Sequence, residues 1–309
     1  MICMNELALG IGISSLTFLK PSEKDMLKKN LDNIKDLALL SIDDISNIIK
    51  RNLKTTLWKP QEIEKYTENC LKIMEVYNIN VCFIEDKEYP SLLKEIFDPP
   101  FMIFWRGNIE CVHKKSVALV GTRKASAQGL KIAFDIAKNV AANGFTVISG
   151  LALGIDGAAH KGAISARVDN DNIKKHGATC AVLACGVENL YPTSHRKLGG
   201  TIIEKGGCIL SEYPPDSKPQ KWCFPARNRI ISGLSSVVAV IEAPKGSGAL
   251  ITADFAIEQG RELVFHTFGA NSNKPELTES KKMDINQYVS DGAPIIKNAD
   301  ELIKIINLR

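Results

Sequence analysis

Between residues 116 and 266, short apolar segments alternate with longer segments in which apolar residues recur every three or four positions. Continuously apolar segments are typical of strands buried on both faces, as in a parallel sheet covered by helices. Right-handed crossovers between such strands give an α/β, Rossmann-like, doubly wound and mostly parallel sheet. The strands are expected at "SVALVG", "FTVISG", "ATCAVLACG", "CILSEYP", "SSVVAVIEA" and "RELVFHTFG".

Residues 1–78 carry a purely helical pattern. Helices are expected over residues 23–40, from Ser41 onward, and from about Pro60, which suits the first turn of a helix. The "GIGIS" segment could belong to a helix-hairpin-helix that grips nucleic-acid backbone, but no basic residues flank it, so a packing turn is favoured. We therefore predict a helical domain at 1–78 and a Rossmann-like domain at 79–309, with 79–115 as its lead-in of strand, helix and strand.

The composition is that of an ordinary globular chain, with 45% apolar and 24% charged residues among 309. A net charge of +4 permits an acidic partner without requiring one. Eight cysteines contain no C-x-x-C pair, which favours free thiols in a reduced, cytoplasmic protein over a zinc site. No apolar run approaches the roughly 18 residues of a membrane helix, and the N-terminus lacks signal-peptide features.

Ligands of a doubly wound sheet bind beyond the carboxyl ends of its strands. The segments that follow the strands are rich in glycine, in hydroxyl groups near helix starts, and in cations, all of which suit phosphates. The candidate contacts from this reasoning are Gly121, Thr122, Arg123, Ser149, Gly150, Lys221, Arg227, Asn228, Arg229, Lys245, Ser247, Gly248 and Thr252.

The segment 221–235, "KWCFPARNRIISGLS", is expected to be a cationic and aromatic loop in front of a core strand. Phe224 and Trp222 alternate with basic residues there. Cationic grooves that follow phosphates and aromatic rings that stack on bases are the two components of single-strand recognition. The alternative is that Phe224 fills the core beneath the loop and that Arg123 is a solvated surface charge.

Other kinds of site have weaker support. The turn "GTRKASAQG" is neither a dinucleotide fingerprint nor a P-loop. Asp156 and His160 lie four residues apart and could be an acid–base pair or half of a metal site, although a helix-start hydrogen bond and a packed histidine are favoured. Glu212 and Glu242 each follow a strand and weakly indicate hydrolysis. No metal or cofactor is expected.

These segments resemble the DprA/Smf family of DNA-processing proteins over roughly residues 80–300. The resemblance rests on "VALVGTRKAS", "VISGLALGIDGAAHKGAI", "AVLACGVENLYP", "ILSEYPP", "FPARNRIISGLSSVVAVIEA" and "SGALITADFAIEQGRE", in that order. It implies a non-enzymatic protein that binds single-stranded DNA without sequence preference. It also implies loading of the RecA recombinase during natural transformation, and a homodimer. By motif position, Arg123 and the group Lys221, Phe224, Arg227 and Arg229 would contact the strand.

Some segments depart from the family pattern. A polar insertion is expected at 166–177, "HTFGANSN" replaces a Pro-Gly ending, and the helical residues 1–78 match only loosely. In the region where the family dimerises, Ile285, Tyr288 and Val289 share one helical face, which either pairs two copies or packs on its own sheet.

An alternative function stays open at this point. Phosphoribohydrolases of the lysine-decarboxylase-like type use a related Rossmann fold, but they need a Gly-Gly-x-Gly-Thr turn followed by a glutamate. "EAPKGSGALIT" lacks that arrangement, since Glu242 precedes its glycines.

Overall fold

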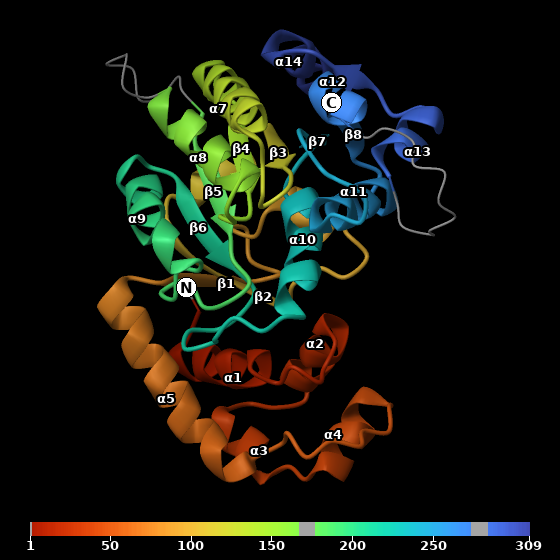
Figure 1. Cartoon of the computed structure of the whole chain (residues 1–309). Helices are drawn as coiled ribbons and strands as arrows, with labels where there is room; N and C mark the ends of the chain where they lie inside the picture. Colours follow the sequence, from red (N-terminus) through yellow and green to blue (C-terminus); the bar gives the residue numbers. More distant parts are fainter. Residues whose placement is uncertain (1, 167–176, 273–283) are drawn as a thin grey trace.

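A computed structural model describes residues 2–166, 177–272 and 284–309 (Figure 1). Within these residues one sheet has nine strands in the order β1-β2-β6-β5-β4-β3-β7-β8-β9. The strands from β6 to β9 in this order pair in parallel, and β1 and β2 extend the β6 edge by antiparallel pairing. The predicted Rossmann-like, mostly parallel fold is confirmed. The insertion predicted at 166–177 lies almost wholly outside the described residues.

The strands of the sheet are short. Their bounds are β1 Asn80–Phe83, β2 Met102–Gly107, β3 Ser116–Val120, β4 Thr146–Ser149, β5 Thr179–Val182, β6 Cys208–Ser211, β7 Val237–Val240, β8 Glu262–His266 and β9 Ile295–Ile296. All six strands expected between residues 116 and 266 are present. The strand β3 lies between β4 and β7, so the chain reverses its winding direction at the β3–β7 pair. The carboxyl ends of β3 and β7 therefore form the topological switch point, where doubly wound folds bind ligands.

Helices cover both faces of the sheet (Figure 1). Val117 and Leu119 of β3 pack on one side with α7 (Ala127–Ala142), α8 (Ile155–Ser165) and α14 (Ala299–Asn307). Ala118 and Val120 pack on the other side with α10 (Cys223–Gly233) and α11 (Gly248–Glu258). The other helices of this part are α6 Ser91–Lys94, α9 Arg196–Glu204, α12 Thr267–Ser272 and α13 Ile285–Ser290, with 3-10 turns at Ile109–His113 and Thr193–His195. Burial on both faces explains why β3 is apolar from Val117 to Val120.

The N-terminal part is helical, as predicted, and lies beside β1 and β2 (Figure 1). Its helices are α1 Met4–Ser14, α2 Pro21–Lys29, α3 Ile34–Leu39, α4 Ile42–Ile49 and α5 Pro60–Tyr77. The single helix expected over 23–40 is two helices, because Asn33 accepts hydrogen bonds from the backbone of Lys35 and Asp36 and starts a new one.

The "GIGIS" segment lies inside α1 rather than in a packing turn. A Cβ on Gly10 would come within 2.5 Å of the Phe83 ring, so glycine lets α1 approach the sheet closely. One apolar core joins Leu9 of α1 with Phe104 of β2 and Leu183 after β5. Packing is therefore continuous across residue 78, and the domain boundary proposed there stays a prediction. None of the helices in the described ranges is long and apolar enough to span a membrane.

Candidate nucleic-acid interface

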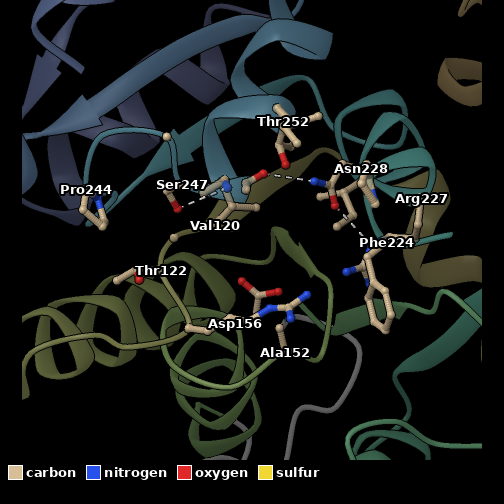
Figure 2. A pocket seen from close by; sticks show the side chains of 18 of the residues that line it. Val120, Thr122, Ala152, Asp156, Phe224, Arg227, Asn228, Pro244, Ser247 and Thr252 are labelled. Carbon is tan, nitrogen blue, oxygen red and sulfur yellow. Dashed lines mark hydrogen bonds between the residues drawn. The ribbon is translucent and has the colours of Figure 1, made fainter. Parts of the chain in front are cut away.

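A cleft of about 460 Å³ opens at the switch point between β3 and β7 (Figure 2). Its walls come from the turn after β3, the start of α8, one face of α10, and the turn from β7 into α11. The residues that line it and carry the argument are Gly121, Thr122, Arg123, Asp156, Phe224, Arg227, Asn228, Lys245, Ser247, Gly248 and Thr252. Eleven residues that were singled out in the sequence, from four separate segments, thus line the same cleft.

The first turn of α11 forms one wall of the cleft. Ser247 caps this helix by accepting a hydrogen bond from the Ala249 amide, and no acidic residue lies in the first turn. Gly248 is exposed, and a Cβ built on it would meet no atom within 4 Å, so its backbone is open to the cleft. Free amides and the helix dipole at such an end favour an anion. Lys245 adds a positive charge beside it.

The corresponding end of α7, after β3, is already occupied by the protein. The Glu242 carboxylate accepts hydrogen bonds from the Ser126 amide at 3.1 Å and from its hydroxyl at 3.0 Å. A Cβ on Gly129 would lie 1.9 Å from this carboxylate, so glycine is required there. A phosphate at this helix end would have to displace a carboxylate of the chain itself, which explains why α11 is the better anion site.

Two aromatic rings and a cation form a cluster at the cleft, with the rings tilted by 57° to one another. The Phe224 ring lies 5.6 Å from the Tyr191 ring, and the Arg123 guanidinium lies 5.2 Å from the centre of the Phe224 ring. Arg123 and Tyr191 are exposed, and Phe224 is half-buried. Phe224 is therefore not a core residue, and its ring and the Arg123 charge are available together. Tyr191 was not among the predicted site residues, although its motif "NLYP" was recognised.

The segment predicted as a loop at 221–235 is mostly helix, so that prediction was wrong. Residues Cys223–Gly233 form α10, with Pro225 in the first turn, where a missing amide hydrogen costs nothing. Phe224, Asn228 and Ile231 then lie on one face, three or four residues apart, and line the cleft. The Asn228 side chain donates a hydrogen bond to the Gly248 carbonyl at 3.2 Å, which ties α10 to the start of α11.

Arg227 is buried beneath the cleft and is held by the backbone. Its guanidinium donates hydrogen bonds to the Gly150 carbonyl at 2.8 Å and to the Val182 carbonyl. It also faces buried Asp156: burial raises the pKa of that carboxyl, and the positive charge of Arg227 opposes the rise. Burial likewise lowers the pKa of Arg227, with Asp156 acting in the opposite direction. Arg227 thus holds together the turns after β4 and β5 rather than presenting a charge to solvent.

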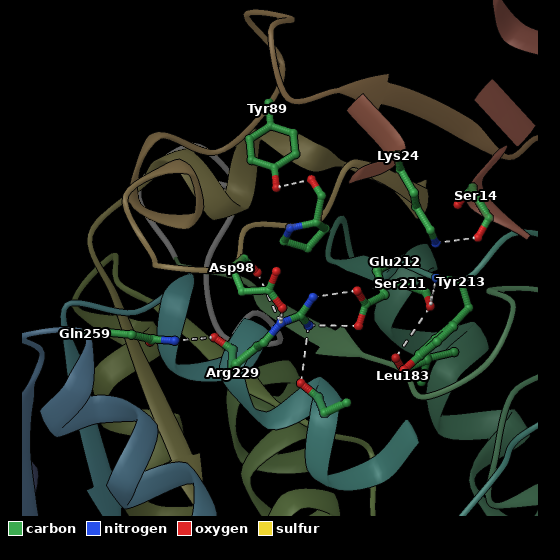
Figure 3. A network of polar contacts seen from close by, with 12 residues as sticks. Ser14, Lys24, Tyr89, Asp98, Leu183, Ser211, Glu212, Tyr213, Arg229 and Gln259 are labelled. Carbon is green, nitrogen blue, oxygen red and sulfur yellow. Dashed lines mark hydrogen bonds and ion pairs between the residues drawn. The ribbon is translucent and has the colours of Figure 1, made fainter. Parts of the chain in front are cut away.

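Arg229 is turned away from the cleft into an ion-pair network (Figure 3). Its guanidinium makes two hydrogen bonds to the Glu212 carboxylate, at 2.6 and 2.8 Å, and a weaker contact to Asp98 at 3.4 Å. Only 8% of the residue is exposed. The predicted phosphate contact at Arg229 is therefore not available in this arrangement, since both ends of its fork are already engaged by a carboxylate.

The remaining predicted residues divide between the cleft and the interior. Thr122 and Thr252 are buried at its lining, whereas Ser149 donates its hydroxyl to the Leu119 carbonyl inside the sheet. Gly150 donates its amide to Asp156 and is covered by Arg227. Lys221 is exposed just before α10 but does not line the cleft. Ser149 and Gly150 therefore support the cleft from the protein interior and do not line it.

The pairs that suggested catalysis are engaged by the protein. His160 is buried, and its ring contacts the Thr179 hydroxyl at 2.7 Å and accepts from the Leu151 amide, while burial lowers its pKa to about 3. It is the packed histidine that was favoured. Glu212 is bound by Arg229 and Glu242 by Ser126, and neither lines the cleft. Among the described residues, no three His, Cys, Asp or Glu side chains are grouped to hold a metal ion.

The face predicted to dimerise is packed inside the chain. Ile285 and Tyr288 are buried in the core under α11, where the Tyr288 hydroxyl donates to Asp254 at 2.6 Å, and Val289 packs beside them. These three side chains follow the alternative arrangement, in which the helix packs on its own sheet. A homodimer stays a prediction, but these residues do not offer it an exposed surface.

Comparison with known proteins assigns the chain to a family. The model of the family described as DNA recombination-mediator protein A matches residues 80–307, which include every wall of the cleft. The chain belongs to this family. The resemblance to DprA/Smf proteins is thereby confirmed.

Relatives in the DNA recombination-mediator protein A family come from distant bacteria. The DNA processing protein DprA of Bacillus subtilis is 38% identical over 223 residues, 71% of each chain. Protein Smf of Borreliella burgdorferi is 32% identical and covers 96% of this chain and 88% of its own length.

Two solved structures of the same family extend the match to the fold. The X-ray structure of DprA from Streptococcus pneumoniae has a TM-score of 0.69 at 29% identity and covers 98% of both chains. The structure of DNA processing protein A from Helicobacter pylori has a TM-score of 0.60 at 27% identity, covers 74% of this chain and 96% of its own, and is described as showing the single-stranded DNA binding mode of that protein. The N-terminal helices thus belong to the region shared with the S. pneumoniae protein.

Proposed function

We propose that this chain binds single-stranded DNA in the cleft between β3 and β7, without sequence preference. The observation that carries the proposal is the cluster of Tyr191, Phe224 and Arg123, together with the open first turn of α11 at the same cleft. Aromatic rings bind unpaired bases of any kind, and the adjacent cations and amides bind the phosphates between them. The H. pylori relative, whose structure is described by its single-stranded DNA binding mode, supports the same ligand class.

The structure suggests a role for each group around the cleft. Arg123, Lys245 and Lys221 would contact phosphates, because each lies at or beside the cleft and none is in an ion pair recorded among the described residues. Phe224 would stack on a base. Arg227 and Asn228 would position the walls, since both are bonded to backbone carbonyls. Arg229 would act only through the stability of α10.

The wider proposal follows the family. We propose that the bound strand is protected and passed to the RecA recombinase during recombination and natural transformation, and that the protein acts as a homodimer in the cytoplasm. The eight free thiols fit a reducing compartment. No enzymatic activity is part of the proposal, and no observation on the cleft favours the phosphoribohydrolase alternative.

The test is fluorescence anisotropy with labelled oligo-dT, in competition with unlabelled duplex of equal length. Single strands should bind more tightly, because stacking requires unpaired bases. If Arg123, Lys245 and Lys221 each neutralise one phosphate, the logarithm of affinity should fall against the logarithm of salt concentration with a slope of about −2. Equal affinity for the duplex would contradict the stacking role and with it the proposal.

The matched pair of variants is Arg123→Ala and Lys304→Ala. Both remove one exposed positive charge, but Lys304 lies on α14, away from the cleft. Only the first should weaken strand binding and reduce the salt slope, by about 0.7.

A further inference from the structure

A second groove begins where the first one ends. It has a volume of about 460 Å³ and lies between the first turns of α7 and the outer face of α8. The two grooves share Arg123, and both are lined by the turn after β3 and by the turn that leads into α8. A ligand that leaves the cleft past Arg123 would therefore enter this groove without crossing a ridge formed by another element.

The groove is basic throughout its described lining. Besides Arg123 its charged or titratable side chains are Lys124, Lys131, Lys161 and His195, and no acidic residue lines it. Lys124, Lys131 and Lys161 are exposed, and no ion pair is recorded for them among the described residues. The nearest acids along the two helices are Asp135 and Asp156, of which Asp135 lines neither groove and Asp156 faces the cleft beside Arg227. A groove lined by several cations and by no acid attracts a polyanion.

The floor of the groove is shaped by residues without bulky side chains. Gly154 has φ +78, and a Cβ there would lie 2.2 Å from the Thr122 carbonyl oxygen, so glycine lets the two turns touch. A Cβ on Gly157 would lie 2.6 Å from the His195 ring. That ring is fixed because its Nδ1 donates to the Leu151 carbonyl at 2.8 Å. Glycine at these two positions thus lets the segments that line the groove pack closely together.

We propose that this groove, named here the α7–α8 groove, carries the phosphodiester backbone of single-stranded DNA beyond the nucleotides held in the cleft. The inference rests on the proposed function and adds a direction to it: the strand runs from the Phe224 ring over Arg123 toward Lys131 and Lys161. The lysines contribute charge alone, so the groove lengthens the binding site without adding sequence preference.

The experiment compares two oligo-dT lengths of about 4 and about 16 nucleotides, the limits of site size for single-strand-binding folds. The variant is Lys131→Gln/Lys161→Gln, which keeps much of each side chain but removes two charges. Its matched control is Lys297→Gln/Lys304→Gln, with two exposed lysines outside both grooves. The first variant should bind the short oligonucleotide as the wild type does, and the salt slope for the long one should fall by about 1.4. The control should match the wild type with both.

Lysine acetylation followed by mass spectrometry gives an independent readout on the unmodified protein. The long oligonucleotide should protect Lys131 and Lys161 as well as Lys221 and Lys245. The short one should protect only Lys221 and Lys245, and neither should protect Lys304. Protection of Lys245 without protection of Lys131 and Lys161 by the long strand would overturn the α7–α8 groove and leave the cleft intact. If neither oligonucleotide protects Lys245, the proposed function itself is contradicted.

Discussion

Replacement of Arg227 distinguishes a structural cation from a ligand contact. The sequence places Arg227 among the strand-binding cations, whereas the structure buries it between the Gly150 and Val182 carbonyls and opposite Asp156. Arg227→Met keeps much of the side-chain length and removes the charge and its hydrogen bonds. Two carbonyls then lose a donor, and the buried Asp156 carboxylate loses its opposite charge.

The cost of this change should be large. Leaving a buried acceptor without its hydrogen-bond donor typically costs about 1–3 kcal/mol, and Arg227→Met does this to two carbonyls. Burial already raises the pKa of Asp156 above the ordinary value of 3.8, and loss of Arg227 should raise it further. A carboxyl with a raised folded-state pKa destabilises the fold when it ionises, so stability falls as pH rises through that pKa. The difference between variant and wild type should therefore shrink as the pH is lowered from 7 toward 4.

The assay is urea unfolding of the wild type, Arg227→Met, and the double variant Arg227→Met/Asp156→Asn at pH 7 and pH 5. The double variant removes the uncompensated carboxylate and should recover part of the lost free energy of unfolding, with a coupling of about 0.5–3 kcal/mol. Arg227→Met should weaken strand binding only indirectly, through a change in the shape of the cleft. Wild-type urea stability together with lost strand binding would show that Arg227 contacts phosphate directly, and the structural role would be refuted.

Three further predictions follow from the same geometry. Phe224→Leu should weaken oligo-dT binding by about 1–3 kcal/mol with an unchanged salt slope and Tm, since it removes a stacking surface but no charge; a lower Tm with unchanged binding would show that the ring only packs. Arg229→Ala should lower urea stability, because it leaves the Glu212 carboxylate without its partner, and the salt slope should stay the same; a reduced slope would restore Arg229 as a phosphate contact. At pH 8 a thiol reagent should modify one cysteine of the native protein, the exposed Cys3. The other seven cysteines are buried, and burial raises the pKa of Cys185 to about 12. Rapid modification of a second thiol would contradict this packing.

Much of the fold could be predicted from the sequence because its strands are buried on both faces. In the β3 segment "SVALV" the residues from Val117 to Val120 are apolar on both sides of the pleat, and β7 ("VVAV") shows the same pattern. The N-terminal helices were less predictable. The pattern over residues 23–40 is compatible with one helix, and only the hydrogen bonds of the Asn33 side chain show that the chain breaks there. A capping asparagine followed three residues later by Asp36 was the available signal.

The position of the cleft could be predicted from the sequence, but the directions in which the nearby arginine side chains point could not. Charge and aromatic content draw attention to the segment 221–235, part of which lines the cleft, and the rule for strand ends predicts a ligand site at that edge of the sheet. The prediction of a loop hid the helical spacing of Phe224, Asn228 and Ile231, which all line the cleft. Pro225 is compatible with a helix here, because proline is tolerated in the first turn of a helix.

Once the segment is a helix, Arg227 and Arg229 cannot both point toward the cleft, and only Arg227 lies at its lining. Arg227 and Arg229 are two positions apart, about 200° around an α-helix, so a helix that points one toward the turns after β4 and β5 points the other toward Glu212. Each meets carbonyl or carboxylate oxygens contributed by segments distant in sequence, such as Val182 and Asp98. A cation count along the chain cannot detect these partners, because they are brought together only by folding. The cations left for a ligand include Arg123 and Lys245 on the turns, for which no ion pair is recorded among the described residues. Mutagenesis of the basic motif as a block would therefore mix loss of folding with loss of binding, and single variants at the turns are the ones that report on the strand.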